Sequence, residues 1–583
     1  MKNILPVLLF TVFLTNCHSP GTLSAESTGI NPYRYGIQKK VTCKNGSVVS
    51  AHPLASKVGV EILKHGGNAI DAAIATQLAL AVVYPAAGNI GGGGFMVARL
   101  RSGELLALDY REKAPLHAGR DMYLDNKGDV IADKSVNGHL AAGVPGTVAG
   151  LFASAKYGKL PFKDLIQPAI DLADKGFVLT EAEARSLNSI QDDLKKFNSV
   201  LPAFVCNDPK HAEWKAGDTL IQKDLANTLK RIRDGGQKGF YEGETARLIT
   251  EEMKRGAGII GAEDLKNYEA KFRQPHVFDY KGYRVVAMPM PSSGGLLLHQ
   301  MMKMIENRNI ALMGFQSAES VHLMAEAERR AFADRAQYMG DADFYKVPDK
   351  MLVSSDYLNA RMKDFKAGVA GNSQTIRPGI LPQKESEQTT HLDVIDKEGN
   401  AVAITTTLNN SYGCKTVVGG AGFFLNDEMD DFSAKPGVPN MYGAVGGEAN
   451  AIEPGKRMLS SMTPTIVLKK DAQDSRYKPY IIVGTPGGTT IPTSVFQTLV
   501  NIIEFNMSTE DAVYKPKFHH QWLPDTLDLE KGFPDSVKLS LERMGYKIEL
   551  RSGIGRTEVI KVLEDAQFEG VADNRGEDDA EGY

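Results

Sequence analysis

The residues best suited to chemistry are Thr389, Thr390 and His391, which open a strand-like run after the polar stretch that ends at Gln388. A threonine hydroxyl is a poor nucleophile unless a base lies beside it. If the chain were cut between Gln388 and Thr389, the new α-amine of Thr389 would be that base, because an unperturbed α-amine has a pKa of about 8. Threonines are also common in strands for structural reasons, so the surrounding residues must decide between the two interpretations.

A β-hairpin is predicted to follow Thr389. Two β-rich runs, THLDVID and NAVAITTTLNN, flank a polar loop that ends in Gly399. A three-residue loop with Gly399 in the left-handed conformation pairs Asp396 with Asn400. Counting back along both strands then places Thr389 opposite Thr407. The first strand therefore begins beside a second hydroxyl group.

Asn409 projects from the same face as Thr407, because side chains alternate along a strand. Both side chains can hydrogen-bond a nucleophile or a substrate. A four-residue loop remains the alternative, and it would place Leu408 opposite Thr389 instead. His391 lies on the Thr389 face by the same alternation; we expect a structural role for it, because the α-amine already supplies the base.

Longer motifs extend over nearly the whole chain after its first residues. In order they are GGNAIDAA (66–73), GNIGGGGF (88–95), LDYREKAP (108–115), GVPGTVAG (143–150), MPMPSSGG (288–295), NDEMDDFS (426–433), GKRMLSSMTPT (455–465), GTPGG (484–488) and FHHQWLPD (518–525). Together with the run from Thr389 they resemble γ-glutamyltranspeptidases, a family of N-terminal-nucleophile hydrolases that cleave themselves to expose a threonine.

The resemblance implies an α+β fold, the αββα sandwich of N-terminal-nucleophile hydrolases. A large subunit, residues 30–388, and a small catalytic subunit, residues 389–583, would form the sandwich jointly as a heterodimer. The chain itself agrees, since helical periodicity over 55–64 and 317–339 is combined with strand-like runs. The acidic end, residues 577–583, is predicted to be a solvated terminus.

A γ-glutamyl group presents an α-carboxylate, an α-ammonium and a side-chain carbonyl. Arg111 can offer a bidentate guanidinium to the carboxylate. The resemblance assigns Arg111 this role, assisted by Ser460 and Ser461. Taken alone, an arginine of this kind is more often a surface residue, and the long motif around it decides the matter.

An ammonium group calls for acceptors and negative charge. Glu428 and Asp431 are three residues apart, so a turn or short helix brings them together. The resemblance assigns both to the ammonium, with Asn409 as a further contact. Without the resemblance, such a cluster is more often a solvated turn.

The negative charge that develops on the attacked carbonyl needs hydrogen-bond donors. Gly487 and Gly488 can bring two backbone N–H groups close to that oxygen, because neither carries a Cβ. The resemblance implies that this pair forms the oxyanion hole. The glycine run 91–94 has no such assignment and predicts close backbone packing.

The resemblance also implies a mechanism. Thr389 attacks the carbonyl of Gln388 in the precursor, and the freed Thr389 then takes the γ-glutamyl group of glutathione or a related compound as an ester. Water completes hydrolysis, and an amino acid or dipeptide acceptor completes transpeptidation. Thr407 would hydrogen-bond the nucleophile, and no metal or organic cofactor is expected. The segment Pro436–Gly447 resembles a lid loop in which Tyr442 closes over the glutamyl group.

Composition excludes several other classes. The 583 residues are 42% hydrophobic, enough for a large core, and the net charge of -4 gives no polybasic footprint for nucleic acid. The sequence contains no GxxxxGK[ST] loop, no HExxH and no CxxC pair. Phosphate chemistry and a catalytic metal therefore lack support.

The first residues predict export from the cytoplasm to the periplasm or cell envelope. Lys2 precedes the apolar run Ile4–Leu14, which is too short to span a bilayer and is typical of a signal peptide, here residues 1–17. Cys17 follows Leu14-Thr15-Asn16 and could be the lipidated, membrane-attached cysteine of a lipoprotein. Asn16 departs from the usual small residue, so an ordinary signal cleaved a few residues later stays open.

Three cysteines remain after Cys17, namely Cys43, Cys206 and Cys414. An odd number allows at most one internal disulfide, and whether Cys43 pairs with Cys206 stays open. Cys414 is predicted to be a packing residue, because no partner base is evident.

Two alternatives to γ-glutamyl transfer deserve comparison. A self-cleaving acylase of the cephalosporin acylase type would act on acyl groups without an α-ammonium, and Asp431 would then have no purpose. A non-enzymatic envelope lipoprotein could keep the fold as a binding surface, but it would have no need of Thr389 and Arg111 together.

Overall fold

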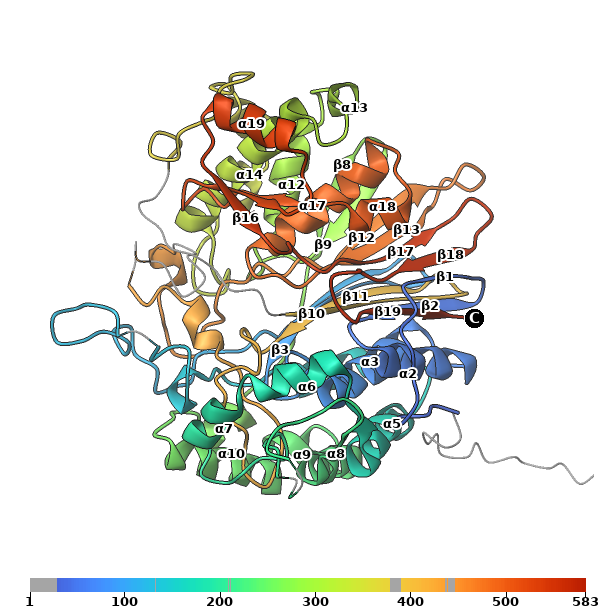
Figure 1. Cartoon of the computed structure of the whole chain (residues 1–583), viewed down its shortest axis with the longest axis vertical. Coiled ribbons are helices and arrows are strands. Elements are labelled where there is room, and N and C mark those ends of the chain that lie inside the picture. The colour runs from blue at the N-terminus through green and yellow to red at the C-terminus, as the bar shows by residue number, and fades with distance from the viewer. Residues whose placement is uncertain are drawn as a thin grey trace, which may run out of the picture.

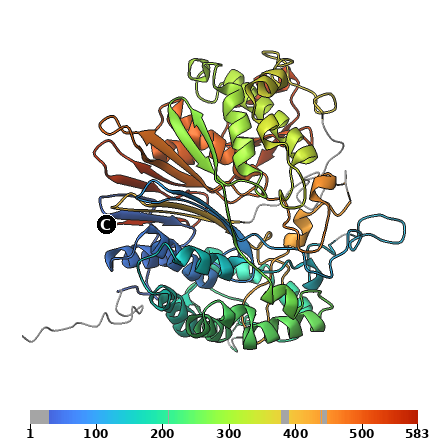
Figure 2. The same ribbon diagram turned by 180° about the vertical axis from the view of Figure 1, so that it is seen from behind.

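The computed structural model describes residues 29–131, 133–207, 209, 211–377, 389–435, 438 and 446–583. Two seven-stranded sheets pack face to face, and helices cover both outer faces (Figure 1 and Figure 2). This arrangement is an αββα sandwich, so the predicted fold class is confirmed.

The first sheet carries the predicted nucleophile. Its strands, in spatial order, are β19 (Asp579–Gly582), β2 (Gly46–Ser50), β10 (Thr390–Asp396), β11 (Ala401–Thr407), β3 (Gly93–Arg99), β4 (Leu105–Asp109) and β7 (Lys271–Arg273). The hairpin β10–β11 is central: β10 pairs with β2, β11 pairs with β3, and both strands are buried along their whole length. Segments from both sides of the predicted cleavage site therefore interleave in one sheet.

The second sheet contains β13 (Tyr477–Gly484), the strand that precedes Gly487 and Gly488. Its strands, in order, are β1 (Lys40–Cys43), β18 (Phe568–Val571), β17 (Glu558–Val562), β13, β12 (Thr465–Lys470), β9 (Tyr283–Ala287) and β8 (His276–Tyr280). Side chains from the two sheets, including Phe95, Val97, Ile466 and Ile482, form one apolar cluster between them. Burial on both faces explains why strands such as β3 read as continuous apolar runs.

Two helical layers complete the sandwich. Over the first sheet lie α2 (Pro53–Lys64), α3 (Ala69–Val83) and α4 (Thr147–Ala155), with α5 (Phe162–Lys175), α6 (Glu181–Asn188), α7 (Gln191–Phe197), α8 (Lys223–Gly235), α9 (Lys238–Tyr241), α10 (Gly243–Arg255) and α11 (Ala262–Lys266) on the same side. On the side of the second sheet lie α12 (Gly294–Ile305), α13 (Ile310–Met313), α14 (Ala318–Tyr338), α15 (Asp349–Leu352), α16 (Ser355–Arg361), α17 (Thr490–Ile503), α18 (Thr509–Tyr514) and α19 (Asp535–Met544).

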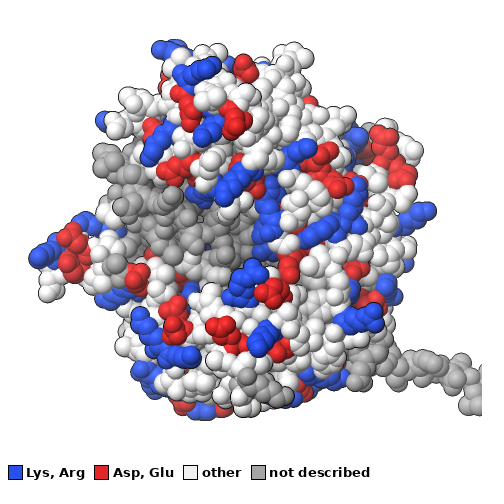
Figure 3. Space-filling model, viewed as in Figure 1, with Lys and Arg blue, Asp and Glu red and all other residues white. Residues whose placement is uncertain are grey.

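Short elements fill the remaining connections. They are the 3-10 turns His139–Ala141, Glu428–Asp431 and Glu448–Asn450, the pair β5 (Phe177–Val178) and β6 (Thr219–Leu220), and the small sheet β14 (Phe518–His519), β15 (Leu527–Glu530) and β16 (Ile548–Arg551). No helix in the described ranges is both long and apolar enough to cross a membrane. Acidic and basic side chains are interspersed over the face seen in Figure 3.

The hairpin register agrees with the prediction. Thr390 pairs with Thr406, and the Asp396 N–H donates to the Asn400 carbonyl at 3.1 Å. Gly399 has a φ of 80°, the left-handed value that the three-residue loop requires. Thr389, one residue before Thr390, therefore comes opposite Thr407. The alternative with Leu408 in that place is wrong.

The predicted helices are also present, and the motif GGNAIDAA gains a structural explanation. The helix expected over 55–64 is α2, and the one expected over 317–339 is α14. Asn68 caps α3: its Oδ1 accepts from the N–H groups of Ile70 and Asp71, and the Asp71 carboxylate accepts from the Asn68 N–H. All of α3 is buried, which suits its almost uniformly apolar sequence.

The prediction of a solvated acidic terminus is wrong. Residues 579–582 form the edge strand β19, which pairs with β2, and Asp578 and Asp579 are buried. Asp578 Oδ1 lies 2.6 Å from Arg556 Nη2, and Asp579 Oδ1 accepts from the Gln38 N–H at 2.7 Å. These partners lie far from the acidic groups along the chain, so no local sequence pattern reveals them.

Candidate active site

A small cavity, of about 30 Å³, gathers the predicted site residues. The predicted residues that line it are Arg111, Thr389, Thr407, Asn409, Glu428, Asp431, Ser460, Ser461 and Gly488. Gly487 directly precedes Gly488 in the same turn. The cavity is also lined by Arg335, Met462, Thr489 and Ile491, which the sequence did not single out. Residues spread over more than 350 positions of sequence thus converge on Thr389.

The hydroxyl of Thr407 is fixed by the chain that follows it. The Asn409 N–H donates to Thr407 Oγ1 at 2.7 Å, and Asn409 has a φ of 75°, which turns the chain out of β11. Asn409 Nδ2 donates to the Asp427 carbonyl at 3.0 Å, which orients the carboxamide. Thr389 itself is 6% exposed. A Cβ on Gly92 would lie 2.1 Å from the Thr407 carbonyl oxygen, so the prediction of close packing at the glycine run is confirmed.

Arg111 lies just beyond the end of β4 and is almost completely buried. Its Nη1 lies 2.5 Å from Glu428 Oε2, and its Nη2 donates to Asp431 Oδ2. Burial alone would lower the pKa of Arg111, but Glu428, Asp431 and Glu112 outweigh it and raise that pKa. The guanidinium is therefore permanently charged and surrounded by acids.

The pKa values of the acids around Arg111 are raised, because burial disfavours their charged forms. Burial raises the pKa of Glu428 well above its usual value, and it also raises the pKa of Asp431. Burial raises the pKa of Glu112 to about 7, although Arg111 opposes the shift. Glu428 and Asp431 occupy one 3-10 turn, as their spacing predicted, but Glu428 is buried and Asp431 is partly buried rather than solvated. A cationic group entering here would relieve this crowding of negative charge.

Ser460 and Ser461 are held by the motif MPMPSSGG. The Ser293 N–H and hydroxyl both donate to the Ser460 carbonyl, at 2.8 and 2.7 Å. Ser460 Oγ accepts from the Met462 N–H at 3.1 Å, and Ser461 Oγ accepts from Arg335 Nη2 at 3.0 Å. Both hydroxyl oxygens are thereby fixed in place.

Gly487 and Gly488 form the turn between β13 and α17. Their φ values are 135° and 54°, and a Cβ on Gly487 would lie 2.3 Å from Thr490 Oγ1. The Thr490 N–H donates to the Gly487 carbonyl at 2.9 Å and closes the entry into α17. A helix N-terminus favours negative charge, so this turn suits an oxyanion.

His391 and the cysteines have no place among the cavity residues. His391 Nδ1 lies 2.8 Å from Thr405 Oγ1 and its Nε2 lies 2.9 Å from Asp393 Oδ1, in agreement with a structural role. Cys43 and Cys206 are both free thiols, which answers the pairing question. Cys414 is buried, and burial raises its pKa to about 12, so it is a packing residue as predicted.

Three predicted positions lie outside the described residues: Gln388 of the cleavage site, Tyr442 of the lid loop and Cys17. Arg335 is the main residue that sequence reasoning missed. It lies near the end of α14, which the sequence predicted only as a helix covering a sheet. Its one sequence signal is the alternation of arginines with small residues along this helix, which does not distinguish a buried charge from an exposed one.

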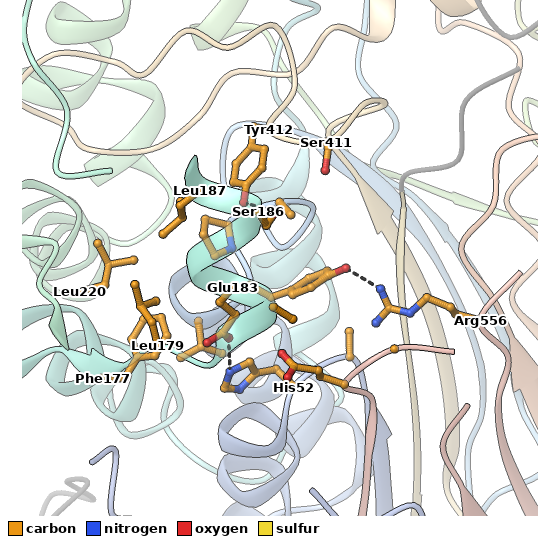
Figure 4. Close-up of a pocket in the computed structure, with 18 residues that line it drawn as sticks. His52, Phe177, Leu179, Glu183, Ser186, Leu187, Leu220, Ser411, Tyr412 and Arg556 are labelled. Carbon is orange, nitrogen blue, oxygen red and sulfur yellow. Dashed lines mark hydrogen bonds and ion pairs between the residues drawn. The ribbon is translucent and has the colours of Figure 1, made fainter. Parts of the chain in front are cut away.

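A larger cavity, of about 260 Å³, lies beside α6 and holds none of the predicted residues (Figure 4). Its polar groups already have protein partners: His52 Nε2 lies 2.8 Å from Glu183 Oε1, and Tyr412 Oη lies 2.6 Å from Ser186 Oγ. Much of the remaining wall is apolar. The smaller cavity is therefore the better candidate for the active site, despite its size.

Comparison with known proteins agrees with this site. A family model described as gamma-glutamyltranspeptidase matches residues 55–583. The glutathione hydrolase proenzyme of Escherichia coli (strain K12) is 47% identical over 561 residues, covering 94% of each chain.

Two solved structures are similar to this chain. A gamma-glutamyltranspeptidase from Helicobacter pylori is 46% identical with a TM-score of 0.55, over 57% of this chain and 94% of that one. A cephalosporin acylase from Bacillus halodurans has a TM-score of 0.80 at 26% identity, over 94% of this chain and 98% of that one. With its sequence, sandwich and threonine-centred cavity taken together, this chain belongs to the γ-glutamyltranspeptidase family.

Proposed function

We propose that this chain is a self-cleaving γ-glutamyltransferase and glutathione hydrolase. The observation that carries the proposal is the convergence on Thr389 of one cavity that holds the buried Arg111, the buried Glu428, the partly buried Asp431 and a glycine turn. These are the groups that an α-carboxylate, an α-ammonium and a developing oxyanion require.

The first step is cleavage of the chain. The hydroxyl of Thr389 attacks the carbonyl carbon of Gln388, the bond to the Thr389 nitrogen breaks, and that nitrogen takes the proton. Water then hydrolyses the resulting ester and leaves Gln388 as a carboxylate and Thr389 with a free α-amine. Thr389 directly precedes β10 and comes opposite Thr407, so the new terminus stays at the cavity.

The second step is turnover. The α-amine accepts the hydroxyl proton while Thr389 attacks the γ-carbonyl, and the amine half of the substrate leaves with that proton. Gly487 and Gly488 N–H groups stabilise the oxyanion, each by about 3 kcal/mol. Water then releases glutamate, or the amine of an amino acid or dipeptide takes the glutamyl group. Thr407 hydrogen-bonds the nucleophile throughout.

Substrate recognition follows from the ion pairs. Arg111 faces the α-carboxylate together with the hydroxyls of Ser460 and Ser461, whereas Glu428 and Asp431 face the α-ammonium. Asn409 supports this assignment, because its Nδ2 is bound to a backbone carbonyl and its Oδ1 is the atom suited to accept from an ammonium.

The two fragments, residues 30–388 and 389–583, remain a heterodimer after cleavage. The hairpin β10–β11 lies between β2 and β3, so separation would break two strand interfaces in the centre of the sheet. Residues 1–17 direct the protein to the periplasm or cell envelope, with Cys17 as the candidate lipid attachment.

The structural likeness to a cephalosporin acylase makes acylase activity the second candidate. An acylase substrate without an α-ammonium leaves the charges of Glu428 and Asp431 without a ligand partner. The ratio of kcat/KM for γ-glutamyl and glutaryl anilides separates the two functions, and we expect it to favour the γ-glutamyl compound strongly.

The proposal is tested by mass spectrometry of the purified protein incubated with glutathione, with and without a dipeptide acceptor. We expect two fragments, release of glutamate and cysteinylglycine, and a γ-glutamyl dipeptide when acceptor is present. The matched control is Thr389→Ala, which should stay uncut and inactive. Glutathione left intact by the cleaved protein would overturn the proposed function.

A further inference from the structure

Arg335 is a buried cation beside the active site that the mechanism above does not use. It lies in the last turn of α14, is 8% exposed, and lines the cavity with Thr389 and Ser461. Its Nη2 donates to Ser461 Oγ at 3.0 Å, and its Nε donates to Ser293 Oγ at 3.1 Å. Burying a guanidinium is costly unless its hydrogen bonds are organised, so its partners indicate its purpose.

Arg335 determines the hydrogen-bonding roles of Ser461 and Ser293. A guanidinium can only donate, and a serine hydroxyl has one hydrogen to give. Ser461 Oγ therefore accepts from Arg335, and its own hydrogen is left for another acceptor. Ser293 differs, because it accepts from Arg335 and gives its hydrogen to the Ser460 carbonyl.

The hydroxyl group of Ser460 is oriented in the same way as that of Ser461. Its Oγ accepts from the Met462 N–H, which leaves its hydrogen to be donated. Within the described part of the chain, neither Ser460 nor Ser461 donates its hydroxyl hydrogen to a protein acceptor. Both hydroxyls line the cavity beside Arg111. Two hydroxyl donors and a guanidinium together make a site for a carboxylate.

We propose that Arg335 is a positioning residue that makes Ser461 an obligate donor to the substrate α-carboxylate and thereby determines specificity for acyl groups that carry one. The inference rests on the proposed function and deepens it. A hydroxyl that accepts from a cation is a stronger donor than one that accepts from a neutral group. Arg335 acts through Ser461 and does not itself touch the reacting atoms.

Charge supports the same role. Burial raises the pKa of Asp431, and both Arg111 and Arg335 oppose that shift. Arg335 thus favours the ionised form of the acid assigned to the ammonium while it orients the donor assigned to the carboxylate. Removing its charge should weaken carboxylate binding first, because Arg335 donates directly to Ser461 Oγ.

The test uses three 4-nitroanilides and the full chain. The γ-glutamyl compound carries both charged groups, the glutaryl compound lacks the ammonium, and the 4-aminobutanoyl compound lacks the carboxylate. For Arg335→Gln we expect KM to rise about tenfold or more for the γ-glutamyl and glutaryl compounds. We expect kcat to change little and the 4-aminobutanoyl compound to be affected less than about twofold. Where turnover is slow, the inhibition constant of the same anilide against the γ-glutamyl compound replaces KM.

A double-mutant cycle separates positioning from general structural support. Ser461→Ala should reproduce the carboxylate-selective rise in KM, and Arg335→Gln combined with Ser461→Ala should be no worse than the poorer single variant. Arg335→Lys keeps the charge but not the two-point geometry, so it should restore the KM only partly. Equal losses with all three anilides, or additive losses in the cycle, would overturn the proposal.

Two controls keep the outcome interpretable. If Arg335→Gln does not fold, Ser293→Ala releases the Nε contact and should give a smaller rise in KM with the same carboxylate selectivity; no selectivity there would equally overturn the proposal. Wild-type protein that cleaves none of the anilides would refute the proposed function. Wild-type turnover with an unselective Arg335→Gln variant would refute the role of Arg335 alone.

Discussion

Arg111 Nη1 lies 2.5 Å from Glu428 Oε2, in a pair that is almost completely buried. The cation assigned to the substrate carboxylate thus neutralises an anion assigned to the substrate ammonium. A substrate with both charges can enter and exchange partners with the pair, whereas a substrate with one charge leaves a buried group unbalanced. We therefore propose that the pair selects for zwitterionic acyl groups.

Asp431→Asn tests this selection. We expect KM for the γ-glutamyl anilide to rise about tenfold to a hundredfold, because a charged hydrogen bond to the ammonium is lost. The glutaryl anilide has no ammonium, so its KM should change far less. Steady-state kinetics with both compounds check the prediction, and equal changes would remove the assignment of Asp431 to the ammonium.

Gly487→Ala tests the oxyanion turn. The added Cβ would lie 2.3 Å from Thr490 Oγ1 at a φ of 135°, so the turn must shift. We expect kcat to fall about a hundredfold with little change in KM, because the donors act in the transition state. The control is Gly119→Ala, whose Cβ meets no atom within 4 Å. Wild-type kcat in the Gly487 variant would show that the turn is not the oxyanion hole.

Thr407→Val tests the hydroxyl beside the nucleophile. Valine has nearly the same shape but cannot accept the hydrogen bond that the Asn409 N–H gives to Thr407 Oγ1 at 2.7 Å. We expect slower self-cleavage and a kcat lower by about tenfold or more, because a buried donor loses its partner. Thr407→Ser keeps the hydroxyl and should stay within a few-fold of wild type. Gel densitometry and kinetics measure both, and equal behaviour of the two variants would exclude the role.

The pairing of β10 with β11 could be predicted from the sequence because its determinants are local. The loop before Asn400 fixes the register, and the register alone brings Thr389 opposite Thr407. Arg111 and Asp431 could not be placed this way, since they lie 320 positions apart and meet only through the fold. Their assignment came from the motifs around them.

What the sequence did not predict are buried charges with distant partners. Arg335 reads as an ordinary surface residue of a long helix until its contacts with Ser293 and Ser461 are known. Asp578 was likewise assigned to a solvated terminus, although Arg556 pairs with it. A charged side chain is predicted to be exposed to solvent. Only the tertiary structure shows where a residue of opposite charge pairs with it and allows it to be buried.

Asp579→Asn tests how the buried terminus responds to pH. Burial raises the pKa of Asp579 to about 7, and Glu581 adds to the shift while the Gln38 N–H opposes it. The folded state then holds a proton that the unfolded state loses above about pH 4, so this group's contribution to stability declines as pH rises to about 7. Asparagine removes that penalty, which is on the order of 4 kcal/mol above pH 7.

We therefore expect the Tm difference, variant minus wild type, to be small near pH 4, to increase up to pH 7 and then to level off. Thermal unfolding of both proteins across this range measures it. A difference that is independent of pH would contradict the raised pKa.

In the proposed mechanism, scission turns Thr389 into an amino-terminal nucleophile. N-terminal sequencing of the fragments of the active protein tests it most directly, with Thr389→Ala as the uncut control and Thr389→Ser as the variant that keeps a hydroxyl. We expect a fragment that begins Thr-Thr-His-Leu, present in wild type, slower to form in Thr389→Ser and absent in Thr389→Ala. A fully active protein without that terminus, or a cleaved Thr389→Ala chain, would contradict it.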